Sequence, residues 1–564
     1  MLVVLSRTEI RNVMYTPDVT GAHILLTYSD IYADDKPNLI ESIKGLNMHK
    51  SISIICELLR VRDSYMEPVR TIGGEFKIPF ETILKRDMCD IVPKSAEDMR
   101  ANPLLYRNNH IISVQMLFML LKKIIVHGNY ETMEQTDYQI EIEDYKTIIK
   151  LQLLVAEEIS EKHKKEMDID HFLYSTYHLN YQRNIANEFL RMYYMMEIVS
   201  RDINAFDADV QRQYRDYYKD FTDKYGFTPI EYSSLLFWQL EEYYSGINGL
   251  AYAPIWKSVE KSYGESEIYG GANRVITTLS KLLVDYKQWA EENEDREWDF
   301  SEFFAAPFIK DTSGRFISLS DITLRNAFFE KIFWLIRDCY PVEDSRAMAF
   351  FGRLYEKYIQ DITEDAANEE FFYIDEFVYT DGRVEKKSSD AYIRKGNDLL
   401  VVEAKGFSVL LNCMTKNENV EVNNDKLFVK PILQADKSLA IVMDEKPEFA
   451  GVETAYIVSV TMDNINAVPN YYNAIHKEIM DKKRSDKVKY FFNFSIEEYE
   501  MLMALMERQI DIFILLKEYY ENDKLKPFST YLHDRYTDIG MTTFMEKCFK
   551  EASDTMKEIL FGVD

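Results

Sequence analysis

The most constraining feature of this chain is an apolar run that ends in charged residues, Leu399-Leu400-Val401-Val402 followed by Glu403-Ala404-Lys405. Consecutive apolar residues of this kind predict a strand that is buried on both faces. Just before the run, Gly396-Asn397 suits the two-residue turn of a β-hairpin, where positive φ angles are needed. We therefore expect two antiparallel strands over 388–394 and 398–405, with Lys395 facing Asp398.

This register places Asp390 opposite Glu403, with Cβ atoms about 5 Å apart. Side chains alternate along a strand, so Glu403 and Lys405 share one face. Two carboxylates at ~5 Å repel by about 3 kcal/mol at an effective dielectric of ~20. A divalent cation would offset this repulsion, and carboxylate oxygens are the ligands that Mg²⁺ or Mn²⁺ prefers. An exposed hairpin with incidental charges is the alternative interpretation.

An acid on one strand and Glu-x-Lys at the end of the next, apolar strand resembles the active-site pattern of the PD-(D/E)xK nucleases, the restriction-endonuclease-like superfamily. In this resemblance Asp390 matches the first acid, Glu403 the second and Lys405 the lysine, while Ser389 stands where a proline is usual. The resemblance covers about residues 340–465. Asp-x-Lys also occurs elsewhere in the chain, but no apolar run precedes those copies.

The resemblance implies a metal-dependent nuclease in which Asp390, Glu403 and the carbonyl of Ala404 bind Mg²⁺ or Mn²⁺. Lys405 would position the attacking water and offset charge in the transition state. Apolar residues at helical spacing predict an amphipathic helix over 344–362. In the resemblance, Glu356 on this helix would complete the metal site directly or through water; an ordinary solvated helix residue is the alternative.

The elements expected around the hairpin follow the core order of that family. Aromatic and β-branched residues predict a strand over 371–380, and 454–460 predicts another buried strand. Between hairpin and last strand we expect an Asn-rich loop over 415–426 that buries little, then a helix that begins at Lys430-Pro431.

Four polar side chains are candidates for contacts with nucleic acid. Lys430 and Gln434 lie on the helix that faces phosphate in many family members; an ordinary helix-surface position is the alternative. Arg394 and Lys395 belong to a basic cluster around the hairpin.

We expect an α/β nuclease core over 341–470, with a mixed central sheet flanked by helices. Residues 1–290 carry no chemical motif and show helical patterns, such as those over 144–162 and 229–244, so a mostly α-helical recognition or regulatory region is expected.

Two further segments flank the expected core. Residues 300–340 predict a hairpin followed by a helix, a lead-in with a loose resemblance to bacterial defence and restriction proteins. Residues 471–564 predict a helical C-terminal region, with a capping box at Ser495 and Glu498 before a helix over 499–520.

The net charge of −28 argues against long-range attraction of nucleic acid, because such binding depends on neutralising phosphates. Local basic runs over 383–395 and 477–489 would have to bind the substrate, with a solvated surface as the alternative. Five scattered cysteines without a CxxC pair indicate neither a zinc site nor a disulfide framework. No secretory signal and no apolar run long enough for a membrane span is evident, so we expect a cytoplasmic protein.

The sequence therefore predicts a Mg²⁺-dependent hydrolase of phosphodiester bonds, an endo- or exonuclease with DNA as the favoured substrate. RNA remains an alternative substrate, and a catalytically silent nuclease fold that serves as a scaffold is an alternative function. Since no nucleotide-binding Gly-x-x-x-x-Gly-Lys loop is present, any ATPase or sensing activity would come from a protein partner, and oligomers are compatible with the sequence. A role in anti-phage defence or restriction follows by analogy.

Overall fold

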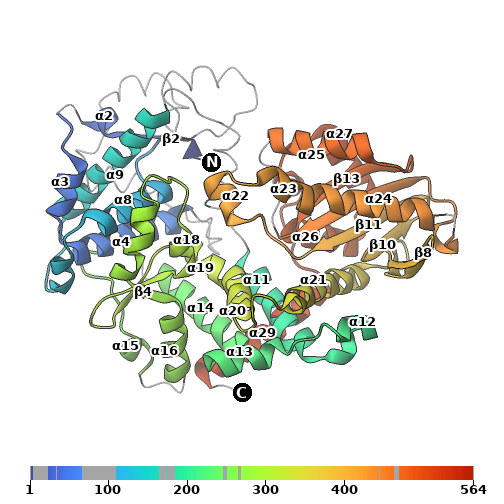
Figure 1. Ribbon diagram of the computed structural model, residues 1–564, viewed down its shortest axis with the longest axis horizontal. Coiled ribbons are helices and arrows are strands. Elements are labelled where there is room, and N and C mark those ends of the chain that lie inside the picture. The colour runs from blue at the N-terminus through green and yellow to red at the C-terminus, as the bar shows by residue number, and fades with distance from the viewer. Residues whose placement is uncertain are drawn as a thin grey trace. The chain divides into compact units, whose positions relative to one another are not determined.

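The computed structural model shows a mixed α/β protein (Figure 1). It describes residues 2–3, 23–32, 35–66, 109–163, 175, 179, 184–245, 250–264, 268–443, 445–462 and 469–562. The chain forms two compact units: unit 1 comprises Met1–Gln182 and Ser234–Ala327, and unit 2 comprises Arg183–Ser233 and Phe328–Asp564. None of the helices in the described part of the chain is long and apolar enough to cross a membrane.

Unit 1 is built mostly from helices that share one apolar core. Helices α4 (Met48–Met66), α8 (Val114–His127) and α9 (Ile142–His163) pack against one another, and their apolar residues are buried together. The expected helix over 144–162 is therefore confirmed. The expected hairpin is confirmed by the antiparallel strands β5 (Phe308–Lys310) and β6 (Phe316–Ser318), which extend a small sheet begun by β4 (Ser280–Leu282). Of the five cysteines in the sequence, Cys89 lies outside the described residues.

Helix α14 (Pro229–Tyr244) begins and ends where the sequence indicates. The backbone N–H of Thr228 donates to Glu231, and the Glu231 N–H donates to the Thr228 hydroxyl, so the first turn is capped reciprocally. The helix expected after the hairpin is divided into α19 (Asp321–Asn326) and α20 (Ile332–Arg337) by a wider turn over 327–331.

Unit 2 contains a mixed five-stranded sheet with strand order β13-β12-β11-β10-β7 (Figure 1). Its strands are β7 (Phe372–Asp375), β10 (Ala391–Lys395), β11 (Asp398–Lys405), β12 (Thr454–Thr461) and β13 (Val488–Ser495). Strands β11, β12 and β13 are parallel, whereas β10 is antiparallel to both of its neighbours. The central strand β11 is apolar and buried along most of its length, as its sequence predicts.

Helices cover this sheet. Helix α21 (Ser345–Ala366) packs on β10 and β11 and against α26 (Ile496–Glu507), while α24 (Lys430–Val442) packs on β11 and β12. The expected amphipathic helix over 344–362 and the helix beginning at Lys430 are confirmed. The capping box at Ser495 and Glu498 is also confirmed, because the N–H of each residue donates to the side chain of the other.

Several expectations about unit 2 are wrong. The expected strand over 371–380 ends at Asp375, and β8 (Val378–Asp381) instead pairs with β9 (Val384–Lys387). Gly382, at φ +70°, forms the tight turn of this second hairpin. The helix expected over 499–520 is interrupted between α26 and α27 (Ile512–Asn522), where Gln509 has a φ of +66°.

The segment expected to be an Asn-rich loop is also ordered differently. It contains α22 (Leu411–Lys416) and α23 (Val420–Asn424), and Asn423 and Asn424 are buried. Asn417 and Asn419 adopt positive φ angles, which asparagine tolerates better than most residues. The asparagines thus end and begin short helices in place of forming an exposed loop.

Residues 183–233 pack within unit 2, so the expected helical region over 1–290 is divided between the units. Helix α11 (Ile185–Met192) packs against α29 (Thr543–Phe561) and carries the buried Arg191. The Arg191 guanidinium pairs with Glu500 at 3.3 Å, and the same carboxylate accepts a hydrogen bond from Tyr358 at 2.7 Å. These buried charges join α11 to α26 and to helix α21 beside the sheet.

Candidate active site

The hairpin β10–β11 has the expected register, with Lys395 opposite Asp398 and Ala391 opposite Val402. Gly396 in the turn has a φ of +58°. The ladder ends at Ala391, however, and the Asp390 N–H donates to the Val402 carbonyl at 3.0 Å. Asp390 is therefore not the direct ladder partner of Glu403, because the chain bends away from the ladder at this residue.

The Asp390 side chain, and not the ladder, connects this residue to the end of β11. It accepts a hydrogen bond of 2.7 Å from the Ala404 N–H. Since the N–H and C=O of a strand residue point to the same side, the Ala404 carbonyl also faces the side of β11 on which Asp390 lies. Asp390 and Glu403 are buried, with 6% and 4% of their surfaces exposed. The Lys405 ammonium lies 2.9 Å from Glu403 Oε1, so these two side chains share one face.

The charged groups at this end of the hairpin shift one another's pKa values. Burial raises the pKa of Asp390 well above its ordinary value, and the negative charges of Glu356 and Glu403 raise it further. Burial also raises the pKa of Glu403, although Lys405 opposes this shift. Burial lowers the pKa of Lys405, but the surrounding carboxylates outweigh it and the net pKa is raised. The site therefore holds more negative charge than its lysine neutralises.

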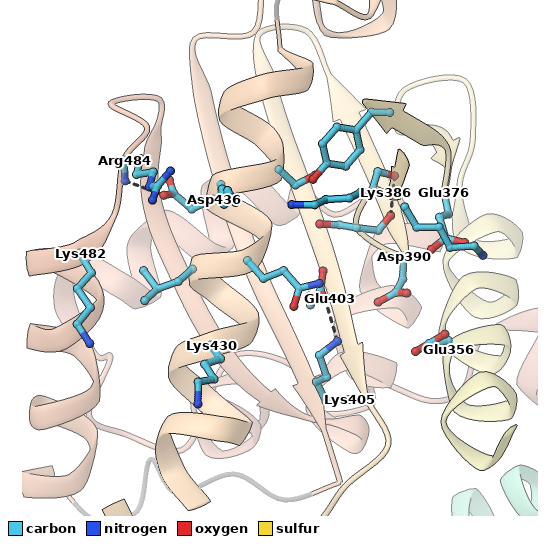
Figure 2. Close-up of a pocket in the computed structure, with 18 of the residues that line it drawn as sticks. Glu356, Glu376, Lys386, Asp390, Glu403, Lys405, Lys430, Asp436, Lys482 and Arg484 are labelled. Atoms are coloured by element: carbon cyan, nitrogen blue, oxygen red, sulfur yellow. Dashed lines mark hydrogen bonds and ion pairs between the residues drawn. The ribbon is translucent and has the colours of Figure 1, made fainter. Parts of the chain in front are cut away.

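These residues line a pocket of about 880 Å³ in unit 2 (Figure 2). The described residues that line it include eight lysine or arginine residues and five acidic residues, in a chain whose net charge is −28. The cations are Arg353, Lys386, Lys387, Lys405, Lys430, Lys437, Lys482 and Arg484; the acids are Glu356, Glu376, Asp390, Glu403 and Asp436. The pocket thus collects a surplus of positive charge around the buried carboxylates of Asp390 and Glu403.

Glu356 reaches the pocket from helix α21, and Figure 2 shows its carboxylate close to that of Asp390. The helix approaches the sheet closely at Gly406, where a Cβ atom would lie 2.9 Å from the Cβ of Tyr355. The Glu356 carboxylate forms an ion pair with Arg353, one turn earlier on the helix. Glu356 therefore contributes negative charge to the site while its own charge is partly neutralised.

The structure separates the four candidates for nucleic-acid contacts. Lys430 and Gln434 line the pocket from helix α24. Arg394 and Lys395 lie at the turn of the hairpin, about 16 Å of strand away from Glu403. There Arg394 donates to the backbone carbonyls of Glu448 and Ala450. Lys395 pairs with Glu370 and Asp511. Neither of these two residues lines the pocket.

Of the other cations that the structure brings to the pocket, Arg353 and Lys437 were not expected, whereas Lys386, Lys387, Lys482 and Arg484 belong to the two basic runs expected to bind the substrate. Lys437 lies one helical turn after Gln434, so the spacing of 430, 434 and 437 is the signal that would have placed it on the same face of α24. Lys482 and Arg484 come from the second basic run, which ends α25 (Pro469–Lys482) and leads into β13. The unexpected β8–β9 hairpin contributes Lys386 and Lys387.

The side chains at the end of the hairpin include possible ligands for a divalent cation. Among the residues that the structure describes, no three His, Cys, Asp or Glu side chains are grouped so as to hold a metal ion. Mg²⁺ commonly uses only one or two protein carboxylates and keeps several waters. Asp390 and Glu403 supply two buried carboxylates whose repulsion a cation would relieve, and the Ala404 carbonyl faces the same side. These residues fit a Mg²⁺ or Mn²⁺ ion.

No protein-family model matches this sequence, and the searches of curated proteins and of solved structures found no match.

Proposed function

We propose that unit 2 is a metal-dependent nuclease with a restriction-endonuclease-like core, which hydrolyses phosphodiester bonds in nucleic acid. The mixed sheet, with its antiparallel β10–β11 hairpin and the flanking helices α21 and α24, supports this assignment of the core. DNA is the expected substrate on the resemblance described above, and RNA is the alternative.

One observation carries the proposal. Two buried carboxylates that repel each other and one lysine lie together in a pocket that concentrates cations in a strongly acidic chain. A fold gains nothing in stability from such a cluster, because burying like charges costs free energy. A cation bound at the carboxylates would neutralise their negative charge, and a phosphate bound at the lysines would neutralise their positive charge.

In the mechanism we infer, Asp390, Glu403 and the Ala404 carbonyl would hold the ion. Bound Mg²⁺ or Mn²⁺ would polarise the scissile phosphate and lower the pKa of a bound water. Glu403 holds the Lys405 ammonium within hydrogen-bonding distance, so Lys405 is oriented before substrate arrives. Lys405 would then donate to the attacking water or to a phosphate oxygen, where it offsets the developing negative charge. Lys430 and Gln434 would orient the phosphate from α24.

The test compares wild type with Lys405→Ala on plasmid DNA, single-stranded DNA and RNA in the presence of Mg²⁺ or Mn²⁺. We expect the variant to lose about 10²–10³-fold in cleavage rate, the magnitude usual for one group that stabilises transition-state charge. Lys395→Ala is the matched control, because Lys395 belongs to the same hairpin but lies at its other end.

Each outcome has a distinct meaning. Equal loss in both variants would indicate a damaged hairpin, and full activity in both would place the chemistry elsewhere. A wild-type protein that binds Mg²⁺ in calorimetry but cuts none of these substrates would contradict the nuclease proposal and favour the silent scaffold.

A further inference from the structure

Three of the cations in the pocket form a surface of their own, which we call the basic wall: Lys437 on helix α24, Lys482 at the end of α25, and Arg484 in the turn before β13. None of these residues belongs to the hairpin that carries the carboxylates. The wall therefore needs an explanation separate from the charge balance of the metal site.

The turn that carries Arg484 is held in place by buried hydrogen bonds. Asp436, which is 1% exposed, accepts hydrogen bonds from the backbone N–H groups of Arg484 at 2.6 Å and Ser485 at 3.0 Å. The Lys483 ammonium donates to the carbonyls of Ser485 at 3.3 Å and Val488 at 3.1 Å. A buried carboxylate is thus used to fix the backbone, and the Arg484 side chain is presented at the pocket.

The positive charges of the wall are accessible for a ligand. Within the part of the chain that the structure describes, Arg484 forms no ion pair. Lys482 pairs with Glu478 on its own helix, and Lys437 lies 3.3 Å from Asp381; both pairs are partly exposed. Exposed pairs of this kind contribute little to stability, typically below about 1 kcal/mol. A phosphate group could replace these carboxylates at small cost.

Position determines what kind of ligand can use the wall. Figure 2 shows Lys482 and Arg484 on one side of helix α24, and Asp390 and Glu356 on the other. A helix with its side chains is about 10 Å across, so one phosphate cannot contact both groups. A strand several nucleotides long can place one phosphate at the carboxylates and others at the wall.

We propose that the basic wall is a second binding position, which holds backbone phosphates of a polynucleotide strand away from the bond that is cut. This inference rests on the proposed nuclease function and narrows its substrate to a polynucleotide, excluding mononucleotides. The wall binds without regard to base sequence, because its groups are cations suited to phosphate. Among the described residues that line the pocket, Tyr379 is the sole aromatic one, and it is only 8% exposed.

The experiment measures binding without cleavage. Fluorescence anisotropy with a labelled oligonucleotide, in EDTA, gives the affinity as a function of salt for the full-length protein. We expect Lys482→Gln/Arg484→Gln to reduce the slope of log affinity against log salt by about 1.4–1.8, since each phosphate contact contributes about 0.7–0.9. Lys550→Gln/Lys557→Gln on α29, away from the pocket, is the charge-matched control and should keep the wild-type slope.

Two further comparisons sharpen the test. Binding of a dinucleotide should be unchanged in the wall variant, because a dinucleotide cannot span α24, and oligonucleotides of different sequence should bind wild type equally. An unchanged slope in the wall variant, or an equal fall in the control, would overturn the inference. If wild type cleaves but the wall variant binds normally, the proposed binding position is wrong and the proposed nuclease function stands. If wild type binds through the wall without cutting, the proposed nuclease function is wrong and the binding position stands.

Discussion

Replacing Asp390 with asparagine should stabilise unit 2 in the absence of a divalent cation while it removes the metal site. Asparagine has nearly the same size, and its amide oxygen can still accept the hydrogen bond that the Ala404 N–H donates to Asp390. The substitution therefore removes one negative charge and leaves the local packing intact. Its effect on the free energy of unfolding reports the electrostatic cost of the carboxylate pair.

The magnitude follows from the charges around Asp390. The charges of Glu356 and Glu403 both act against the ionised Asp390, and like charges at separations of roughly 5–8 Å repel by about 2–3 kcal/mol at an effective dielectric of ~20. Lys405 offsets part of this, and a hydrogen bond to a charged acceptor is worth about 1 kcal/mol more than one to a neutral acceptor. We expect a net gain of about 1–2 kcal/mol for Asp390→Asn.

The gain should also depend on pH, with a definite sign. The pKa of Asp390 is raised in the folded protein, so folding favours the protonated carboxyl and wild-type stability falls as the pH rises above the ordinary Asp range. The asparagine variant has no such group to lose a proton. The difference in stability between variant and wild type should therefore increase with pH.

Hydrogen exchange of the β11 amides suits this test, because it reports on unit 2 without interference from unit 1. In EDTA the amides should be better protected in Asp390→Asn than in wild type. With saturating Mg²⁺ the order should reverse, since a ligand stabilises only the protein that binds it. Asp486→Asn, an exposed acid outside the pocket, should change neither value. Lower protection of Asp390→Asn in EDTA, or equal protection by Mg²⁺ in variant and wild type, would refute the reasoning.

Two more predictions concern packing and buried charge. Gly406→Ala should destabilise unit 2 by about 1–3 kcal/mol, because the added Cβ would lie 2.9 Å from the Cβ of Tyr355. Gly352→Ala in α21, where no atom lies within 4 Å of the added Cβ, should be neutral or stabilising by up to about 1 kcal/mol. Hydrogen exchange of the β11 amides measures the stability of both variants. In unit 1, burial raises the pKa of Asp63 to about 6, so wild-type stability should fall by about 3 kcal/mol as the pH rises from ~4 to above ~6. Asp63→Asn should remove that fall in a denaturation series followed by tryptophan fluorescence, and an unchanged pH profile would contradict the assignment.

The parts of unit 2 that were predictable from sequence are those whose signals are local. The turn at Gly396-Asn397 and the apolar run before Glu403 specify the β10–β11 hairpin within twenty residues, and its register followed directly. The bend at Asp390 was not predictable in this way. It arises because the Asp390 N–H donates to the Val402 carbonyl, which lies outside the regular pairing of the two strands. No pattern of residue types predicts this hydrogen bond.

The sequence did not predict other elements of unit 2, whose neighbours in the fold come from more distant parts of the chain. Strand β13 falls in the region expected to be helical, although Tyr490 to Phe494 is rich in aromatic residues, which favour strands. The β8–β9 hairpin carried a usable signal, Asp381-Gly382, which favours the same kind of tight turn as Gly396-Asn397. The separation of Arg394 and Lys395 from the pocket needed the structure, because the carbonyls and acids that bind them come from remote segments.

The acidity of the chain and the binding of a polyanion are compatible once the cations are located. At an ionic strength of ~0.1 M, charges more than about 10 Å apart are largely screened, so an approaching strand responds mainly to the groups nearest to it. The fold brings those groups together from α21, the β8–β9 hairpin, α24 and the turn before β13, which are separated by up to about 130 residues of sequence. The fold gathers the cations of the pocket from these segments, while the rest of the chain carries the net negative charge. The same charge distribution would therefore favour productive contact at the carboxylates over indiscriminate binding elsewhere.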